Sequence, residues 1–292
     1  MRCTYKVTHA LHDFGFKILC GAVLFSLSAS PLYAASVNCN ANGQELQKQI
    51  DVANTGDVIS IEGVCDGGTY TVRNKHISMR GQGGGATLSA PDGGIVLVVV
   101  NASVSLDNLD IVGGDEDGIF AVTGSNLSLS HVAIHDAAGA AIHVSESSFA
   151  NFDSSEFYDN GLGLLFTENS SFLMADTSIT NNGGFGIFML GGGSGSLYPN
   201  NLIDGHNVGI AVNLPSSLRM SGATLTNNTT GVKVSRFGFV QLDTSNTFAN
   251  NAVDLRCEES AGIAANELQA SNDGQPGNVD SDGSCTIIGP IF

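Results

Sequence analysis

The sequence predicts an all-β fold, a single-stranded right-handed parallel β-helix whose three-strand coils repeat about every 22–23 residues. Two independent anchors carry this prediction. The last apolar residue before each polar turn recurs at steps of 23, 23, 22, 24, 22 and 23 residues, at Ile111, Ile134, Phe157, Ile179, Ile203, Leu225 and Phe248. A small residue recurs at steps of 22, 23, 23, 23 and 22, at Gly118, Ala140, Gly163, Gly186, Gly209 and Gly231. Agreement between the two anchors is typical of repeat architectures.

Within each repeat the apolar residues alternate with polar ones, which is the period of a β-strand and not of a helix. Three such short strands cannot bury their apolar face alone, whereas stacked coils can. The register is ambiguous in one coil, because Ala141/His143 and Ile142/Val144 compete for the interior. We expect Ile142 and Val144 to point inward.

Polar residues end each third strand at the same place in the repeat. The repeat places an asparagine at this point in four coils, at Asn160, Asn182, Asn228 and Asn251. Coils stacked about 4.8 Å apart bring these side chains into register, so each amide can hydrogen-bond the next. We therefore predict an asparagine ladder with a structural role.

These repeats resemble the parallel β-helix (PbH1) repeats of the pectin-lyase-like superfamily, over about residues 57–256. The segment ISMRGQGGGATL, which follows a Gly-Asp turn and a short strand, resembles the N-terminal segments of the same superfamily. The resemblance implies a groove along the outward face of the first strand of each coil. On the expected register this face carries Phe120, His143, Leu165, Phe188, Ala211, Lys233 and Asp254.

The catalytic sets that the superfamily implies are not matched residue by residue. Pectate lyases in the superfamily use acidic calcium ligands and an Arg, and polygalacturonases use several Asp with Gly-His-Gly and Arg-x-Lys. Gly205-His206-Asn207 matches only part of the Gly-His-Gly motif, and its neighbouring coils lack the acidic partners. We therefore expect His206 to interrupt the asparagine ladder and assign it no catalytic role.

The chain is expected to contain four segments. Residues 1–35 are predicted to be a signal peptide, because basic residues precede an apolar run that is too short to span a bilayer comfortably. Residues 36–56 form an N-terminal cap with an amphipathic helix, residues 57–256 form the β-helix, and residues 257–292 form a C-terminal tail. Export through the signal peptide predicts an extracellular or periplasmic protein without a membrane anchor.

Four cysteines lie outside the predicted signal peptide, an even number that suits an oxidising compartment. Cys39 and Cys65 precede the regular coils, and Cys257 and Cys285 follow them. We therefore pair Cys39 with Cys65 and Cys257 with Cys285, each bond contributing about 3–4 kcal/mol in the chain-entropy account. A zinc site is the alternative, but the spacings do not fit and no His lies near either pair.

The charge of the chain bears on its partners. Of the 11 basic and 28 acidic residues, three basic residues and one acidic residue lie in residues 1–35, which leaves 8 and 27 and a net charge of −19. Such a surface disfavours nucleic acid, and it disfavours anionic polysaccharides unless calcium bridges them. Solubility alone also accounts for the acidity. We expect a monomer.

A polar cluster in the early coils contains the best candidates for catalysis. Asp115 and Asp117 share one turn, His135 and Asp136 lie in the turn stacked on it, and His143 enters the next strand. Carboxylates in adjacent coils can share a proton or a calcium ion, and a neighbouring His can act as acid or base. The alternative is that acidic residues simply favour exposed turns. A lyase mechanism lacks an obvious base here, because the cations of the regular coils lie far along the axis.

A second candidate is a calcium site in the C-terminal tail. Asn278, Asp280 and Asp282 have the alternate spacing that opens a calcium loop, and Gly283 follows. The acidic residue that should close such a loop is absent, because residue 289 is Gly. Calcium is the one cofactor that the sequence suggests.

The third candidate is an apolar stripe of Phe120, Leu165 and Phe188, which could stack on sugar rings or contact another protein. Two alternatives remain open. The tail could cover the stripe, or a register error of one residue would place these side chains in the core.

Two functions from different classes follow from these observations. The first is a secreted β-helix protein with a carbohydrate-related role, a polysaccharide lyase, hydrolase or epimerase that acts through the polar cluster. The second is a non-catalytic, glycan-binding or adhesin-like solenoid, which the apolar stripe and the missing catalytic sets favour. The sequence leaves open whether the protein is an enzyme.

Overall fold

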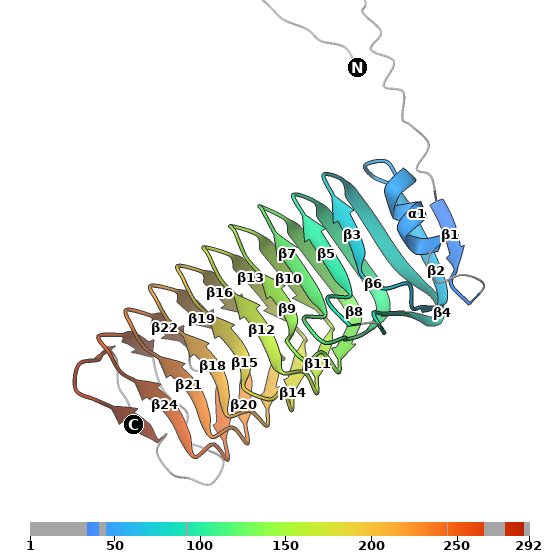
Figure 1. Ribbon diagram of the computed structural model, residues 1–292. Helices are drawn as coiled ribbons and strands as arrows, with labels where there is room; N and C mark the ends of the chain where they lie inside the picture. The colour runs from blue at the N-terminus through green and yellow to red at the C-terminus, as the bar shows by residue number, and fades with distance from the viewer. Residues whose placement is uncertain (1–33, 41–44, 92, 244, 266–277, 289–292) are drawn as a thin grey trace, which may run out of the picture. The chain divides into compact units, whose positions relative to one another are not determined.

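The computed structural model describes residues 34–40, 45–91, 93–243, 245–265 and 278–288. Within these ranges the chain forms an all-β parallel solenoid of about ten coils with one short helix, as predicted (Figure 1). Residues 1–33 of the predicted signal peptide lie outside the described residues. Its last two residues, Ala34 and Ala35, begin a strand. None of the helices in the described ranges has the length and apolarity of a membrane span.

One sheet of the described residues has ten strands, one from each coil. Its order along the solenoid is β3 (Tyr70–Arg73), β5 (Leu97–Val100), β7 (Ile119–Val122), β9 (Ala140–Val144), β12 (Leu162–Phe166), β15 (Phe185–Met189), β18 (Val208–Val212), β21 (Thr230–Val234), β24 (Val253–Cys257) and β26 (Val279–Ser281). Each strand pairs in parallel with the strands of the coils before and after it. The strands therefore carry rows of side chains that run along the solenoid.

The other sheet has seventeen strands within the described residues and folds around the rest of the core. It contains β1 (Ala34–Asn38), β2 (Val58–Cys65), β4 (His76–Ser89), β6 (Ser103–Val112), β8 (Asn126–His135), β10 (Phe149–Asp153), β11 (Glu156–Tyr158), β13 (Ser171–Ala175), β14 (Ser178–Thr180), β16 (Ser194–Leu197), β17 (Leu202–Asp204), β19 (Ser217–Met220), β20 (Thr224–Thr226), β22 (Phe239–Leu242), β23 (Thr247–Ala249), β25 (Gly262–Ala265) and β27 (Thr286–Ile288). From β10 to β23, each coil contributes two separate short strands to it. The early coils contribute one long strand that continues around the bend.

The core consists of rows of apolar side chains that run along the solenoid. Each row contains the residues that occupy the same inward-facing position in successive coils. Ile142 and Val144 are fully buried and His143 points outward, which confirms the expected register in the ambiguous coil. Aromatic rings fill the middle coils, where Phe166 stacks on Phe172 with ring centroids 4.3 Å apart. Burying each side chain of this size contributes about 1.5–3 kcal/mol, so the stacked coils supply the stability that a single coil lacks.

The asparagine ladder is present and longer than predicted. Asn160 Nδ2 donates to Asn182 Oδ1 at 3.0 Å, and Asn228 Nδ2 donates to Asn251 Oδ1 at 3.1 Å. The sequence analysis expected His206 to interrupt the ladder, and this expectation was wrong. His206 occupies one position of the ladder, between Asn182 and Asn228. Its ring accepts from Asn182 Nδ2 at 3.3 Å and donates to Asn228 Oδ1 at 3.1 Å, because the imidazole can replace both groups of an amide.

A short helix caps the N-terminal end of the solenoid, as predicted. In α1 (Glu45–Val52), Leu46 and Ile50 are buried against the first coil. The amide of Gln47 exchanges two hydrogen bonds with the backbone of Thr71, at 2.7 and 3.1 Å. The Gln47 side chain thereby replaces a neighbouring strand at the edge of the ten-stranded sheet. Lys75 Nζ binds the carbonyl oxygen of Ile50 at 2.7 Å and so caps the helix C-terminus.

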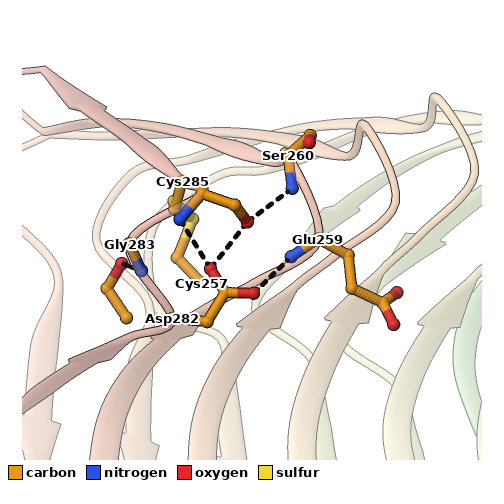
Figure 2. The surroundings of a disulfide bond; sticks show 8 residues. Cys257, Glu259, Ser260, Asp282, Gly283 and Cys285 are labelled. Carbon is orange, nitrogen blue, oxygen red and sulfur yellow. Dashed lines mark hydrogen bonds between the residues drawn. A yellow bond between two sulfur atoms is a disulfide. The ribbon is translucent and has the colours of Figure 1, made fainter.

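Both predicted disulfides are present. Cys39 and Cys65 join β1's end to β2 with Cα atoms 4.9 Å apart, and Cys257 and Cys285 join the last coils with Cα atoms 5.7 Å apart (Figure 2). Both separations lie within the usual range for disulfide bonds. The first bond fixes the capped end, and the second fixes the opposite end.

The C-terminal segment differs from its prediction as a tail that caps the end or lies along one face. β25 pairs with β22, β26 with β24, and β27 with β25, so the coils continue beyond residue 256. The preceding coil offers free backbone donors and acceptors, which recruit a parallel strand whatever its side chains. The apolar pattern of residues 279–288 is too weak to reveal this.

Candidate functional site

The outer face of the ten-stranded sheet carries a row of side chains, one from each of the seven consecutive strands from β7 to β24. The row consists of Phe120, His143, Leu165, Phe188, Ala211, Lys233 and Arg256. Six of these residues were expected there. Asp254 was expected instead of Arg256, but it is buried, and its carboxylate accepts from Asn251 Nδ2 at 3.1 Å as the last member of the ladder. The expected register of β24 was therefore wrong by two residues, because Arg256 and not Asp254 pairs with Lys233.

Asp117 and His143, two of the predicted catalytic residues, lie together on this face. Asp117 Oδ2 is 3.4 Å from His143 Nδ1, and both side chains are about a quarter exposed or less, at 20% and 24%. Asp117 Oδ1 accepts from the backbone N–H of Ala140 at 2.7 Å, which fixes the carboxylate. A Cβ on Gly139 would collide with Asp117 Oδ1, so this close approach requires glycine.

A chain of hydroxyl groups continues from the other ring nitrogen. His143 Nε2 is 3.1 Å from Thr167 Oγ1, and Thr167 Oγ1 donates to Ser145 Oγ at 2.8 Å. Ser145 Oγ in turn donates to Glu168 Oε2 at 3.1 Å. The sequence analysis missed Thr167, Ser145 and Glu168. Their signal was their spacing, because Thr167 lies 24 residues, about one coil, after His143.

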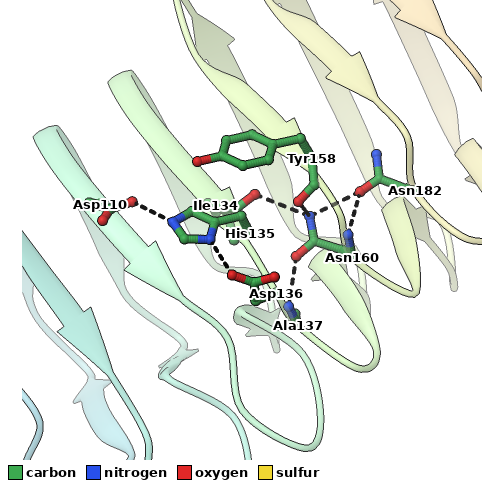
Figure 3. Close-up of polar contacts among 8 residues, drawn as sticks. All are labelled: Asp110, Ile134, His135, Asp136, Ala137, Tyr158, Asn160 and Asn182. Atoms are coloured by element: carbon green, nitrogen blue, oxygen red, sulfur yellow. Dashed lines mark hydrogen bonds and ion pairs between the residues drawn. The ribbon is translucent and has the colours of Figure 1, made fainter.

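His135 and Asp136 lie on the other sheet, with two residues that the sequence analysis missed (Figure 3). His135 Nδ1 is 2.7 Å from Asp136 Oδ2, and its Nε2 is 3.1 Å from Asp110 Oδ1. The ring stacks on Tyr158 with centroids 4.8 Å apart. Burial raises the pKa of Tyr158, and the charge of Asp110 and Glu156 raises it further. Both nitrogens of His135 are thus engaged by carboxylates.

The five predicted catalytic residues therefore separate into two pairs and one single residue. Asp117 and His143 face outward from the ten-stranded sheet, whereas His135 and Asp136 belong to the seventeen-stranded sheet and the turn after it. Asp115 is exposed in its own turn. The corner between the two sheets separates groups that are close in sequence, so the single cluster expected from the turns is not formed.

The apolar stripe lies on the same face as Asp117 and His143. Phe120, Leu165 and Phe188 are partly exposed, and the ring of Phe120 lies 4.9 Å from that of His143. Phe185 stacks on Phe188 with centroids 4.6 Å apart and an interplanar angle of 17°. The outward-facing part of the register prediction is confirmed for all three residues.

A cavity of about 420 Å³ opens on this face beyond Phe188. Its lining includes Phe185 and the cations Lys233, Arg236 and Arg256. Each cation is paired with a carboxylate: Lys233 with Glu258, Arg236 with Glu259 at 2.9 Å, and Arg256 with Asp280 at 3.1 Å. The cavity therefore offers both donors and acceptors at one end of the apolar stripe.

The three residues of the predicted calcium loop have different partners in the structure. Asp280 pairs with Arg256, and Asn278 Nδ2 donates to the carbonyl of Ala252 at 2.7 Å. Asp282 accepts from Ser284 Oγ at 2.6 Å, a hydrogen bond that holds the pKa of Asp282 below its ordinary value. The part of the chain that the structure describes contains no group of three His, Cys, Asp or Glu side chains that could hold a metal ion. Calcium binding stays a prediction.

Comparison with known proteins gives one family and several similar folds. The family described as "Right handed beta helix region" matches residues 33–171 and 117–273. An alginate lyase from Paenibacillus sp. str. FPU-7 is 13% identical with a TM-score of 0.56, covering 88% of this chain and 98% of the lyase. The pectate lyase Pel9A is 12% identical with a TM-score of 0.48, covering 87% of this chain and 77% of the lyase. No curated protein matches the sequence.

Proposed function

Because the chain belongs to the right-handed β-helix family, we propose that it is a carbohydrate-related protein that binds a polysaccharide along its ten-stranded sheet. The fold that it shares with an alginate lyase supports this class of ligand only by analogy. The proposal therefore depends on the face itself.

One observation carries the proposal. Apolar side chains are partly exposed on three coils of one row, at Phe120, Leu165 and Phe188. Hydrogen-bonding groups lie within this stripe, at His143, and beyond Phe188, in the cavity. Flat apolar groups stack on sugar rings, while polar groups at the edges bind hydroxyl or carboxylate groups. Neighbouring members of the row are about 4.8 Å apart because that is the spacing of parallel strands. A linear polymer could therefore contact several of them at once.

Catalysis on this face would use Asp117 and His143. The imidazole lies beside the apolar stripe and is held by a carboxylate at 3.4 Å, an arrangement that suits a general acid or base. Both nitrogens of His135 are bound by carboxylates on the other sheet, which favours a structural role for His135 and Asp136. The reaction would be a lyase, hydrolase or epimerase reaction on the bound polysaccharide.

A second candidate is the non-catalytic glycan-binding or adhesin-like solenoid. One observation favours it: Lys233, Arg236 and Arg256 are each paired with a carboxylate. None of these three side chains is therefore available in the cavity to take a proton from a substrate. Binding needs only the apolar stripe and the hydrogen-bonding groups around it.

The proposal also covers where the protein is located and whether it binds calcium. The two disulfides support export to the periplasm or the cell exterior, because such bonds persist in oxidising compartments. Calcium could bridge an anionic polysaccharide to this acidic surface, or bind at Asn278, Asp280 and Asp282.

The experiment is a screen of neutral and acidic polysaccharides for binding and depolymerisation, with calcium and with chelator. Phe188→Ala should weaken binding, whereas Leu173→Ala, a matched apolar substitution on the outer face of the other sheet, should not. Depolymerisation that is lost in Asp117→Asn/His143→Gln would establish the enzyme. Binding that is equal in wild type and Phe188→Ala would overturn the proposed surface.

A further inference from the structure

The contacts of His143 define an ordered arrangement of three chemical groups, a carboxylate, an imidazole and a hydroxyl. Asp117 Oδ2 lies 3.4 Å from Nδ1, and Thr167 Oγ1 lies 3.1 Å from Nε2. The two partners therefore occupy opposite nitrogens of one ring. A nucleophile within hydrogen-bond reach of a base, with the base oriented by a third group, is the arrangement that activates a hydroxyl for acyl transfer.

The surroundings fix each member of this arrangement. The backbone N–H of Ala140 holds the second oxygen of Asp117 at 2.7 Å, and the ring of Phe120 lies 4.9 Å from that of His143. Ser145 Oγ, 2.8 Å from Thr167 Oγ1, is itself directed to Glu168. The single hydroxyl proton of Thr167 thus has two acceptors within reach, Ser145 Oγ and His143 Nε2. Rotation about one bond moves it between them.

The arrangement differs from what the rest of the row offers. Leu165 and Phe188 carry no titratable group, and the polar groups of the cavity lie three to five coils further along the sheet. Phe120, on one side of His143, supplies an apolar wall for a small substituent. A substituent carried by a polysaccharide on the stripe would therefore meet Thr167 and His143 between Phe120 and Leu165.

We propose that Thr167 and His143 form a hydrolytic site for acyl esters, with Asp117 as the positioning residue. Thr167 and His143 are the catalytic residues, because they would contact the ester and its reacting atoms. The substrate class is an O-acylated sugar, such as an acetyl ester on the polysaccharide. The inference deepens the proposed function and rests on it for the polymeric substrate, but a small ester tests the chemistry alone.

The steps conserve atoms and electrons. Thr167 Oγ1 bonds to the ester carbonyl carbon while its proton passes to His143 Nε2. The bond between that carbon and the sugar oxygen then breaks, and Nε2 returns the proton to the sugar oxygen. The acyl group remains on Thr167 as an ester. Water attacks this ester with His143 as base, which releases the carboxylic acid and restores the hydroxyl group. No oxidant, reductant or further reactant is needed.

The test measures release of acetate from 4-nitrophenyl acetate and from acetylated polysaccharide. Thr167→Val keeps the shape of the side chain and removes the hydroxyl, so hydrolysis should fall by at least about 100-fold. Thr167→Ser should keep most of the activity. His131→Gln, which removes an exposed histidine on the other sheet, is the matched control for hydrolysis by surface imidazole. Asp117→Asn should lower kcat with little change in KM and shift the pH profile of kcat, which a merely structural residue would not do.

Several outcomes separate this inference from the proposed function. A wild-type protein that hydrolyses neither ester, or a Thr167→Val protein as active as wild type, overturns the hydrolytic site. Polysaccharide binding that persists in either case leaves the binding face intact. Should Thr167→Val fail to fold, labelling of wild type by a fluorophosphonate gives the answer, because mass spectrometry should find the adduct on Thr167. Absence of that adduct counts against the site.

Discussion

His206 Nδ1 lies 3.1 Å from Asn228 Oδ1, and this contact fixes the protonation state of a histidine inside the ladder. The other nitrogen accepts from Asn182 Nδ2, so the ring donates through Nδ1 and accepts through Nε2. A second proton on Nε2 would face an amide donor. The neutral tautomer is therefore the form that the folded ladder accommodates.

The stability of the protein should depend on pH through His206. Burial lowers the pKa of His206 from its ordinary value of 6.5, although the hydrogen bond to Asn228 opposes the shift. The unfolded chain then binds a proton that the folded chain does not, so stability is full above about pH 6.5 and falls as the pH decreases below it. The loss approaches about 1.4 kcal/mol per pH unit. Urea unfolding at pH 5 and pH 8 measures it.

His206→Asn restores the residue that the other coils use and removes this titration. It should keep most of the stability at pH 8 and lose less than wild type at pH 5. His131→Asn, on the exposed surface, serves as the control and should leave the wild-type difference unchanged. An equal loss at pH 5 in wild type and His206→Asn would contradict the account.

Asn228→Ala should destabilise the protein at every pH. The side chain accepts from the backbone N–H of His206 at 2.9 Å and donates to the carbonyl of Ile203 at 3.1 Å, both in the buried interior. Leaving such groups unpaired costs about 1–3 kcal/mol for each. Chemical unfolding should show a loss of several kcal/mol. Asn151→Ala on the outer face of β10 is the control, expected to change stability by less than about 0.5 kcal/mol.

Gly139→Ala should damage the Asp117–His143 pair without unfolding the solenoid. A methyl group at this position would occupy the place of Asp117 Oδ1, so the carboxylate must move away from the imidazole. The ring resonances of His143 in NMR spectra should therefore differ from those of wild type, because the carboxylate 3.4 Å from Nδ1 has moved. Unchanged ring resonances with an intact fold would show that the pair is not held as described.

Removing the bond between Cys257 and Cys285 should loosen the last coil first. β26 and β27 end the two sheets within the described residues, and the disulfide ties them to β24. The double substitution Cys257→Ser/Cys285→Ser should cost about 3–4 kcal/mol in the chain-entropy account. Amide hydrogen exchange in residues 279–288 should be faster in the variant than in wild type, and this increase should be larger than any increase in β12. Equal protection of residues 279–288 in wild type and variant would mean that strand pairing alone holds this coil.

The fold was predictable from the sequence because its causes are local and repeated. The regular spacing of Ile134, Phe157 and Ile179 sets the number of residues in each coil, and the alternation within each strand determines which side chains are buried. The disulfide pairing followed from position along the same axis. The last coil was missed because its strands are held by backbone hydrogen bonds, and its side chains lack the apolar alternation.

The candidate site was predictable only in part. His143 and Asp117 are recognisable as titratable residues in adjacent coils, and the register confirmed that they meet. The sequence also grouped His135 with them, because 8 residues separate the two histidines. The corner of the solenoid places them on different sheets, and sequence distance does not report on such a bend. Thr167, which follows β12, was missed because its spacing of one coil from His143 has no meaning until His143 is known to face outward.

We propose that the outer face of the ten-stranded sheet binds a polysaccharide, and calorimetric titration tests this most directly. The best ligand from the polysaccharide screen is titrated into wild type, Phe188→Ala and Leu173→Ala. We expect Phe188→Ala to weaken binding by about 10-fold, because one aromatic contact is lost, and Leu173→Ala to match wild type. Equal affinities for all three proteins, or a loss confined to Leu173→Ala, would contradict it.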